Sequence, residues 1–234
     1  MRKFLSILLA ALLLLPSLSA AVLAETGPSR VILVASFGTS YNDSRAVTIE
    51  AVESAITAAF PDWEVRRAFT AQTIIDKLAS RDGLAIDNVD EAMQRLIADG
   101  VKEVIVQPTH VMPGYEYTDL IEAVSAYSGS FDKLAIGKPL LYTEEDYEAV
   151  IDAVTAEIPE VGSDETAVVF MGHGTEHFAN ATYSQLEHMM HSEGYENLFV
   201  GTVEGYPRID DVIASVTAFG ASKVVLYPLM VVAG

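Results

Sequence analysis

The chain has 234 residues, half of them apolar, and a formal net charge of −19 at pH 7. This charge argues against a nucleic-acid partner, because phosphate backbones are bound by basic surfaces. The chain contains no cysteine, which excludes disulfide frameworks and thiolate metal sites. Any bound metal must therefore be held by His, Asp or Glu. The length is sufficient for one large domain or two small ones.

The start of the chain has the layout of a secretory signal peptide. Two basic residues precede an apolar run that begins at Phe4, and Val22 and Ala24 stand at −3 and −1 of a cleavage site. We therefore expect a signal peptide over 1–24 and an exported protein, periplasmic in a Gram-negative source, without stable membrane insertion after cleavage. The alternative is an uncleaved anchor, because the apolar run is almost long enough to span a bilayer.

Beyond the leader, apolar runs typical of buried strands alternate with stretches typical of helices. Strands are expected at 30–38, 63–70 and 101–111, and helices at 43–60, within 74–97, at 116–127 and at 144–157. Further strands are expected at 166–174, 197–205 and 222–234, and further helices at 179–194 and 206–220. This alternation predicts α/β architecture with parallel, doubly wound sheets.

The pattern of the first part of the chain recurs in the second. Residues 99–114 overlay on 219–234 without gaps. The run 34–40 also resembles 169–175, with Phe37 opposite either Met171 or His173, depending on a shift of two residues.

The repeat predicts two similar doubly wound halves with a cleft between them. We expect an N-terminal half at 25–163 and a C-terminal half, carrying the metal ligands, at 164–234. The first half continues well beyond its third strand, whereas the second stops at the end of a strand, so we expect the second half to be incomplete.

Two polar residues stand at neighbouring strand ends of the second half. In open α/β sheets, ligands bind beyond the carboxyl ends of the strands. His173 and Glu204 follow strands that flank a single helix, so both side chains are expected in one cleft. An imidazole and a carboxylate together suit a divalent metal and can move protons. The alternatives are that His173 only hydrogen-bonds its loop, and that Glu204 is solvated or caps the helix near Pro207.

Other histidines offer competing sites. The run 173–177 has the letters of a zinc-peptidase motif, H-x-x-E-H, but flanking glycines after a strand disfavour the helix that such a motif requires. His188 and His191 are three residues apart on an expected helix and form either a second metal site or a solvated face. The glycine-rich loops at 37–40 and 172–175 would suit an anion, although neither has phosphate-loop spacing.

Taken together, five motifs resemble the anaerobic sirohydrochlorin cobaltochelatases, relatives of ferrochelatase. They are VILVASFGTS, VQPTHVMPGYEY, FMGHGTEH, VEGYP and YPLMVVAG, which extend in order over 31–234. The resemblance implies a lyase of tetrapyrrole and cobalamin biosynthesis that inserts Co²⁺, and in some members Fe²⁺, as a substrate metal, with no organic cofactor. Exported members of the family occur.

The resemblance also implies site residues. His173 and Glu204 fall on the family's metal-binding and catalytic positions, and a third ligand, a histidine, is expected just after Gly234. The first half would shape the tetrapyrrole pocket through six residues: Ser36, Phe37, Gly38, Thr39, His110 and Tyr115. Tyr117 is a further candidate for an apolar wall, and Arg45, Arg67 and Arg208 are candidate counter-charges for the substrate carboxylates.

One rival function and two properties stay open at this point. An exported two-lobed protein would also suit a carrier that captures a metal or a tetrapyrrole without turnover. Assembly is open between a single chain and a homo-oligomer. The sequence does not choose among cobalt, iron and nickel as the physiological ion.

Overall fold

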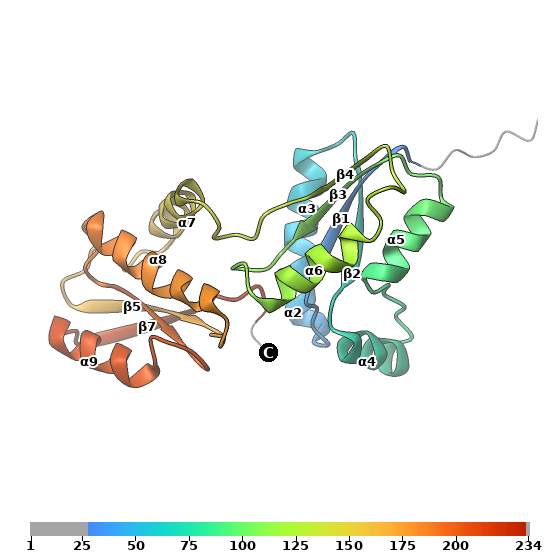
Figure 1. The fold of residues 1–234 in the computed structure, drawn as a ribbon. Helices are drawn as coiled ribbons and strands as arrows, with labels where there is room; N and C mark the ends of the chain where they lie inside the picture. Colours follow the sequence, from blue (N-terminus) through green and yellow to red (C-terminus); the bar gives the residue numbers. More distant parts are fainter. Residues whose placement is uncertain (1–27, 233–234) are drawn as a thin grey trace, which may run out of the picture.

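The computed structural model describes residues 28–232, so the predicted signal peptide at 1–24 lies outside the described residues. Within them the chain forms two α/β halves, each built on its own parallel sheet (Figure 1). None of the helices in this range combines the length and the apolar character that crossing a membrane requires.

The first sheet has the strand order β2-β1-β3-β4 and the second β6-β5-β7. The strands of the first are β1 (Arg30–Ser36), β2 (Glu64–Phe69), β3 (Glu103–Pro108) and β4 (Lys133–Ile136). Those of the second are β5 (Thr166–Gly172), β6 (Leu198–Thr202) and β7 (Lys223–Pro228). The fold predicted from the sequence, two similar parallel-sheet halves, is confirmed.

Helices cover both faces of each sheet (Figure 1). Those that precede β4 are α2 (Asn42–Val47), α3 (Ile49–Ala59), α4 (Gln72–Asp82), α5 (Val89–Ala98) and α6 (Tyr115–Ser125). After β4 come α7 (Glu144–Glu157), the short 3₁₀ helix η1 (Phe178–Asn180), α8 (Ala181–Ser192) and α9 (Ile209–Phe219). Helices α5 and α6 share a buried core with β1 and β3, while α8 and α9 pack on opposite faces of the second sheet.

Strand register shows how the two halves correspond. Ala35 in β1 pairs with Pro108, and Met171 in β5 pairs with Pro228. Ala35 is therefore equivalent to Met171. Two residues further along each chain segment, Phe37 is equivalent to His173. The overlay that the sequence left open is thus decided: Phe37 occupies in the first half the position that His173 occupies in the second.

The corresponding position on the neighbouring strand also differs. The Ala71 amide donates to the Phe37 carbonyl at 3.2 Å, and the Glu204 amide donates to the His173 carbonyl at 2.8 Å. Ala71 is therefore the counterpart of Glu204. Because the first half has a phenylalanine and an alanine at these two positions, its copy of the pair cannot bind a metal.

Three features of the fold differ from the sequence prediction. The helix expected at 43–60 is interrupted at Thr48, whose hydroxyl donates to the Ser44 carbonyl at 2.7 Å, a contact that bends helices. Strand β4 was not predicted. Helix α7 was assigned to the first half, yet its buried residues pack in the core of the second sheet, with β5 and α8.

Candidate active site

A cavity of about 440 Å³ lies between the halves, at the carboxyl ends of β1, β3, β5 and β6. Its volume is within the range of small-molecule sites, roughly 300–1,000 Å³. Its lining is mostly apolar, and the polar groups include three carboxylates, those of Glu116, Glu176 and Glu204. Among the described residues that line it there is no Lys or Arg. A cavity with this lining attracts cations.

The structure brings His173 and Glu204 together in this cavity. The His173 Nδ1 and Glu204 Oε2 atoms are 3.9 Å apart, and each side chain is 66% exposed. The two side chains therefore face one another at short range, and both are open enough for an ion held between them to be delivered to a third molecule.

The backbone fixes which nitrogen of His173 is available. Its Nδ1 lies 3.0 Å from the carbonyl oxygen of Gly174. A carbonyl only accepts, so Nδ1 carries the proton and Nε2 keeps its lone pair. Metal-binding histidines typically donate their second N–H to a carbonyl or a carboxylate in this way.

The loops that carry His173 and Glu204 are fastened to one another. Asn180 accepts a hydrogen bond from the Thr175 amide at 3.1 Å and donates one to the Tyr206 carbonyl at 2.6 Å. At Gly174, where φ is +84°, a Cβ atom would lie only 2.4 Å from the Gly205 nitrogen. The separation of the two candidate ligands therefore depends on a close contact between two glycine backbones.

The first half forms the other wall through Ser36, Phe37 and Gly38, all of which line the cavity as predicted. Phe37 is exposed there, and the hydroxyl of Ser36 accepts from Thr109 at 2.9 Å. At Gly38, with φ of +97°, a Cβ atom would collide with the Phe69 ring. The apolar ring of Phe37 is thus presented to whatever occupies the cavity.

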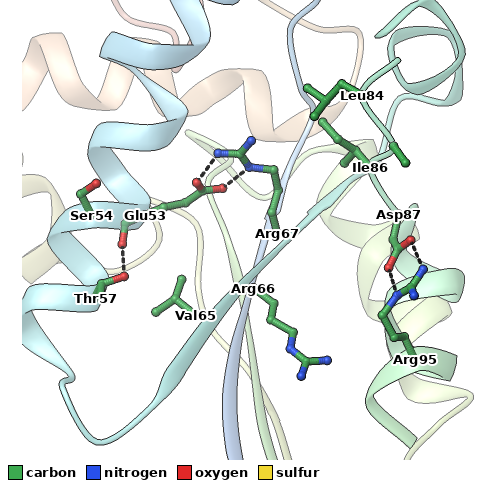
Figure 2. A pocket seen from close by; sticks show the side chains of 11 residues that line it. Glu53, Ser54, Thr57, Val65, Arg66, Arg67, Leu84, Ile86, Asp87 and Arg95 are labelled. Carbon is green, nitrogen blue, oxygen red and sulfur yellow. Dashed lines mark hydrogen bonds and ion pairs between the residues drawn. The ribbon is translucent and has the colours of Figure 1, made fainter. Parts of the chain in front are cut away.

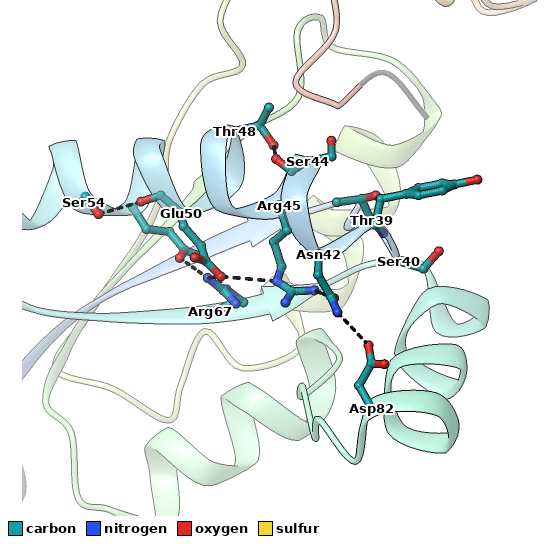
Figure 3. A network of polar contacts seen from close by, with 12 residues as sticks. Thr39, Ser40, Asn42, Ser44, Arg45, Thr48, Glu50, Ser54, Arg67 and Asp82 are labelled. Carbon is teal, nitrogen blue, oxygen red and sulfur yellow. Dashed lines mark hydrogen bonds and ion pairs between the residues drawn. The ribbon is translucent and has the colours of Figure 1, made fainter.

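Beyond Gly38, a polar network outside the cavity holds the segment that leads into α2 (Figure 3). Arg81 donates to the Ser40 carbonyl at 2.6 Å. Arg45 donates to Asn42 at 2.9 Å, and Asn42 in turn donates to Asp82 at 3.3 Å. The network joins α2 to α4 and so supports the Phe37 wall from behind.

Thr39 and the three arginines have other roles than those predicted. Thr39 is 2% exposed, its hydroxyl accepts from the Tyr41 amide at 3.1 Å, and it does not line the cavity. Arg45 and Arg67 bind acidic side chains of α3, and Arg208 is also absent from the lining. None of the three arginines faces this cavity. For Arg45 and Arg67 the reason is that acidic side chains of α3 are nearer partners.

His110 and Tyr115 both line the cavity, as predicted from the sequence. The ring of Tyr115 packs edge-on against that of His177 from the second half, with centroids 4.7 Å apart. Tyr117, by contrast, is buried and donates its hydroxyl proton to the Gly137 carbonyl at 3.2 Å, so it is not a wall of the cavity. Both ring nitrogens of His110 are shielded from solvent and have no hydrogen-bond partner among the described residues.

Burial of the His110 ring makes stability depend on pH. Burial lowers the pKa of His110 below the ordinary value of 6.5, and the charge of Glu116 opposes the shift only in part. Below about pH 6.5 the unfolded chain binds a proton here that the folded chain resists, so stability falls as the pH decreases. The native protein should therefore lose free energy of unfolding between pH 7.5 and 5.5. We expect His110→Met to remove up to about 1.4 kcal/mol of that loss.

Urea unfolding of the native protein and of His110→Met, each at both pH values, measures this loss of stability. His188→Gln is the matched control, because it also replaces a histidine, one that is exposed on α8. An equal loss of stability in the native chain and in His110→Met would contradict the assignment.

The remaining histidines do not form metal sites. The run 173–177 is not helical, and His177 Nδ1 accepts from the Ala179 amide at 3.1 Å, so the peptidase motif is absent. His191 donates its Nε2 proton to the Leu198 carbonyl at 2.8 Å and packs edge-on against the Phe199 ring, whereas His188 is exposed on α8. Across residues 28–232, no group of three or more His, Asp or Glu side chains is arranged to hold a metal.

A larger groove, of about 690 Å³, lies on the outside of the first half (Figure 2). It contains three arginines, but each is paired with a carboxylate. Arg67 donates to Glu53 at 2.7 Å, and Arg95 donates to Asp87 at 2.6 Å. Arg66 likewise pairs with an acidic neighbour. Since these charges are already neutralised, the groove offers no site for an anion.

Several residues of the site were missed in the sequence. Val231 and Val232, beyond β7, contact the first half and line the cavity. Met112, Glu176 and Tyr183 also line it. Sequence position relative to a strand end was the only available signal, and it does not distinguish these residues from their neighbours.

Comparison with known proteins places this geometry in context. Residues 30–234 match the family model described as Cobalt chelatase (CbiK). A sirohydrochlorin cobaltochelatase of Salmonella typhimurium is 41% identical over 205 residues, which cover 88% of this chain and 77% of the relative. The sirohydrochlorin cobaltochelatase CbiKC of Nitratidesulfovibrio vulgaris is 33% identical, covering 87% of this chain and 72% of the relative.

A solved structure shares the fold at low sequence identity. SirB from Bacillus subtilis with Fe³⁺ superposes with a TM-score of 0.58 at 14% identity, covering 85% of this chain and 76% of that chain. At this identity the likeness concerns the two-halved fold alone.

Proposed function

Because the chain belongs to the cobalt chelatase (CbiK) family, we propose that it inserts Co²⁺ into sirohydrochlorin, with His173 and Glu204 holding the ion. The observation that supports these roles is the 3.9 Å separation of the two side chains in a largely apolar cavity. The metal is a substrate, and the reaction requires no redox change.

Metal insertion sets two requirements that the pair satisfies. Two pyrrole N–H bonds break as Co²⁺ enters the macrocycle, so two protons must be accepted. The ion must also be held weakly enough to leave. Two protein ligands leave most coordination positions open for water and then for the macrocycle nitrogens. As Glu204 releases the ion, its carboxylate becomes free to accept a proton.

The first half contributes shape rather than metal chemistry in this proposal. Phe37 and Tyr115 are exposed in the cavity and present aromatic surface to a flat macrocycle. Such rings favour stacked or edge-on contacts. We also propose that the protein is exported, which rests on the leader pattern of residues 1–24 alone.

The test is an assay of metal insertion, monitored through the absorbance change of the tetrapyrrole as it takes up the metal. The full chain is mixed with sirohydrochlorin and Co²⁺, and the expected result is many metallated molecules for each chain. Fe²⁺ and Ni²⁺, supplied separately, establish the metal preference. Binding that stops at one tetrapyrrole or one ion per chain, without metallated product, would support a carrier and contradict the proposal.

Two carboxylates of the cavity provide a matched comparison. Glu204→Gln removes the charge beside His173, and we expect its Co²⁺ affinity to fall at least about 10-fold because a neutral amide is a poorer ligand. Glu176→Gln changes an exposed carboxylate three residues from His173, and its affinity should stay within about threefold. Calorimetric titration with Co²⁺ distinguishes the two. Equal effects would indicate general electrostatic attraction rather than a ligand.

A further inference from the structure

The imidazole of His110 is isolated at the edge of the cavity. It follows β3 and belongs to the wall that the first half supplies. Its backbone carbonyl accepts from the Leu140 amide at 3.0 Å, but neither ring nitrogen has a hydrogen-bond partner among the described residues. Buried polar groups are nearly always paired, and an exception indicates strain, a missing ligand or a chemical role.

Packing does not require a histidine at this position. The Thr109 amide donates to the Ala35 carbonyl, and the Leu229 amide donates to its counterpart, the Met171 carbonyl. Thr109 and Leu229 are therefore equivalent, and His110 is the counterpart of Met230, which lines the same cavity. The second half fills the position with an apolar side chain of similar length. The two nitrogens of His110 thus serve something other than the fold.

The surroundings of His110 suit a proton acceptor. Burial disfavours the charged ring, so at neutral pH the ring is neutral and one nitrogen keeps a lone pair. Glu116, at the start of α6, favours the charged form once a proton has arrived. The ring is thus poised between the two states that a general base must occupy.

His173 and Glu204 face a conflict that a separate base resolves. A lone pair that binds Co²⁺ is not available for a proton until the ion has moved. Both candidate ligands come from the second half, whereas His110 comes from the first. A macrocycle between the walls would therefore meet the ion from one side and a free base from the other.

We propose that His110 accepts one of the two pyrrole protons, from the wall opposite the pair that holds the metal. One N–H bond breaks toward the His110 lone pair, and the other proton passes to the carboxylate of Glu204 as it releases the ion. Co²⁺ takes the place of the two protons, and both protons then leave to solvent. This inference rests on the proposed function.

Access to His110 requires the walls to part, because its ring nitrogens are shielded in the chain without substrate. The edge-on contact between Tyr115 and His177 joins the two halves at this cavity. A single aromatic contact is weak compared with the surface that a macrocycle buries. Binding is therefore able to break this contact and let the two walls part.

Two substitutions test the role of the ring. His110→Met copies the second half and keeps the packing, whereas His110→Gln keeps a hydrogen-bonding group that does not titrate. In both we expect kcat to fall at least about 100-fold, the low end of the effect of a general base. KM should change less than about threefold, and Co²⁺ affinity without tetrapyrrole should not change. His188→Gln, on the outer side of α8, is the control. Native kcat, or a loss confined to KM, would overturn the proposal.

Absence of turnover in the native chain would refute the proposed function rather than the role of His110. A second measurement therefore tests His110 without relying on turnover. The ring ¹⁵N signals of His110 are identified by their absence from His110→Gln. Addition of metal-free sirohydrochlorin should shift these signals in the native chain. Signals that stay in place while the tetrapyrrole binds would show that His110 does not contact it, and would overturn the inference.

Discussion

Replacement of His173 by alanine is expected to abolish metal insertion while leaving the fold intact. The side chain is 66% exposed, and its close polar contacts within residues 28–232 are the Gly174 carbonyl and Glu204. Its loss should therefore change the free energy of unfolding by no more than about 0.5 kcal/mol. Without the imidazole, Glu204 holds Co²⁺ alone, and we expect turnover to fall at least about 100-fold. Metallation rate, Co²⁺ titration and urea unfolding measure the three quantities.

His188→Ala is the matched control for this experiment. His188 is also an exposed histidine of the second half, but it lies on α8 and does not line the cavity. We expect native turnover and native Co²⁺ affinity in this variant. Retention of both properties in His173→Ala would exclude the imidazole as a ligand, and the role of the pair would have to be abandoned.

Replacement of Gly174 by alanine is expected to lower stability and to weaken Co²⁺ binding at the proposed metal site. Its φ of +84° disfavours any side chain, and the added Cβ would lie 2.4 Å from the backbone nitrogen of Gly205. Backbone atoms cannot turn away as a flexible side chain can. The loops of His173 and Glu204 must therefore separate. We expect a loss of about 2–4 kcal/mol in the free energy of unfolding and at least about a 10-fold loss of Co²⁺ affinity.

Gly220→Ala separates the effect of backbone strain at a positive φ from the effect of the collision between the two loops. Gly220 ends α9 with φ of +86°, but apart from its chain neighbours no described residue has an atom within 4 Å of the position where its Cβ would be. We expect this control to lose only about 1 kcal/mol, from backbone strain alone, with Co²⁺ affinity unchanged. Equal losses of stability in the two variants would show that contact between the loops does not set the ligand separation.

Local pattern was sufficient to place the proposed metal ligands, His173 and Glu204, at neighbouring strand ends. Each buried strand ends at a polar loop, and parallel strands that flank one helix tend to be neighbours. His173 and Glu204 follow two such strands, and they lie together in the structure. The duplication was also visible in the sequence, since β3 and β7 occupy corresponding positions of the two overlaid segments.

The partner of each charge could not be inferred in the same way. Arg67 was a candidate for substrate binding, yet it pairs with Glu53, which precedes it by 14 residues. The sequence contains 33 acidic residues, and nothing local indicates which of them an arginine will meet. A salt bridge depends on how a helix and a strand are oriented after they pack.

What the sequence by itself determined about this protein is its parallel α/β repeat and the strand ends that carry His173 and Glu204, because strand periodicity and loop position are local properties. Only the tertiary structure decided that α7 covers the second sheet, that Phe37 is the counterpart of His173, and that Gly174 packs on Gly205. It alone showed that neither ring nitrogen of His110 has a hydrogen-bond partner among the residues that the structure describes. These features depend on contacts between segments distant in the chain, and such contacts form only when both halves have folded and packed.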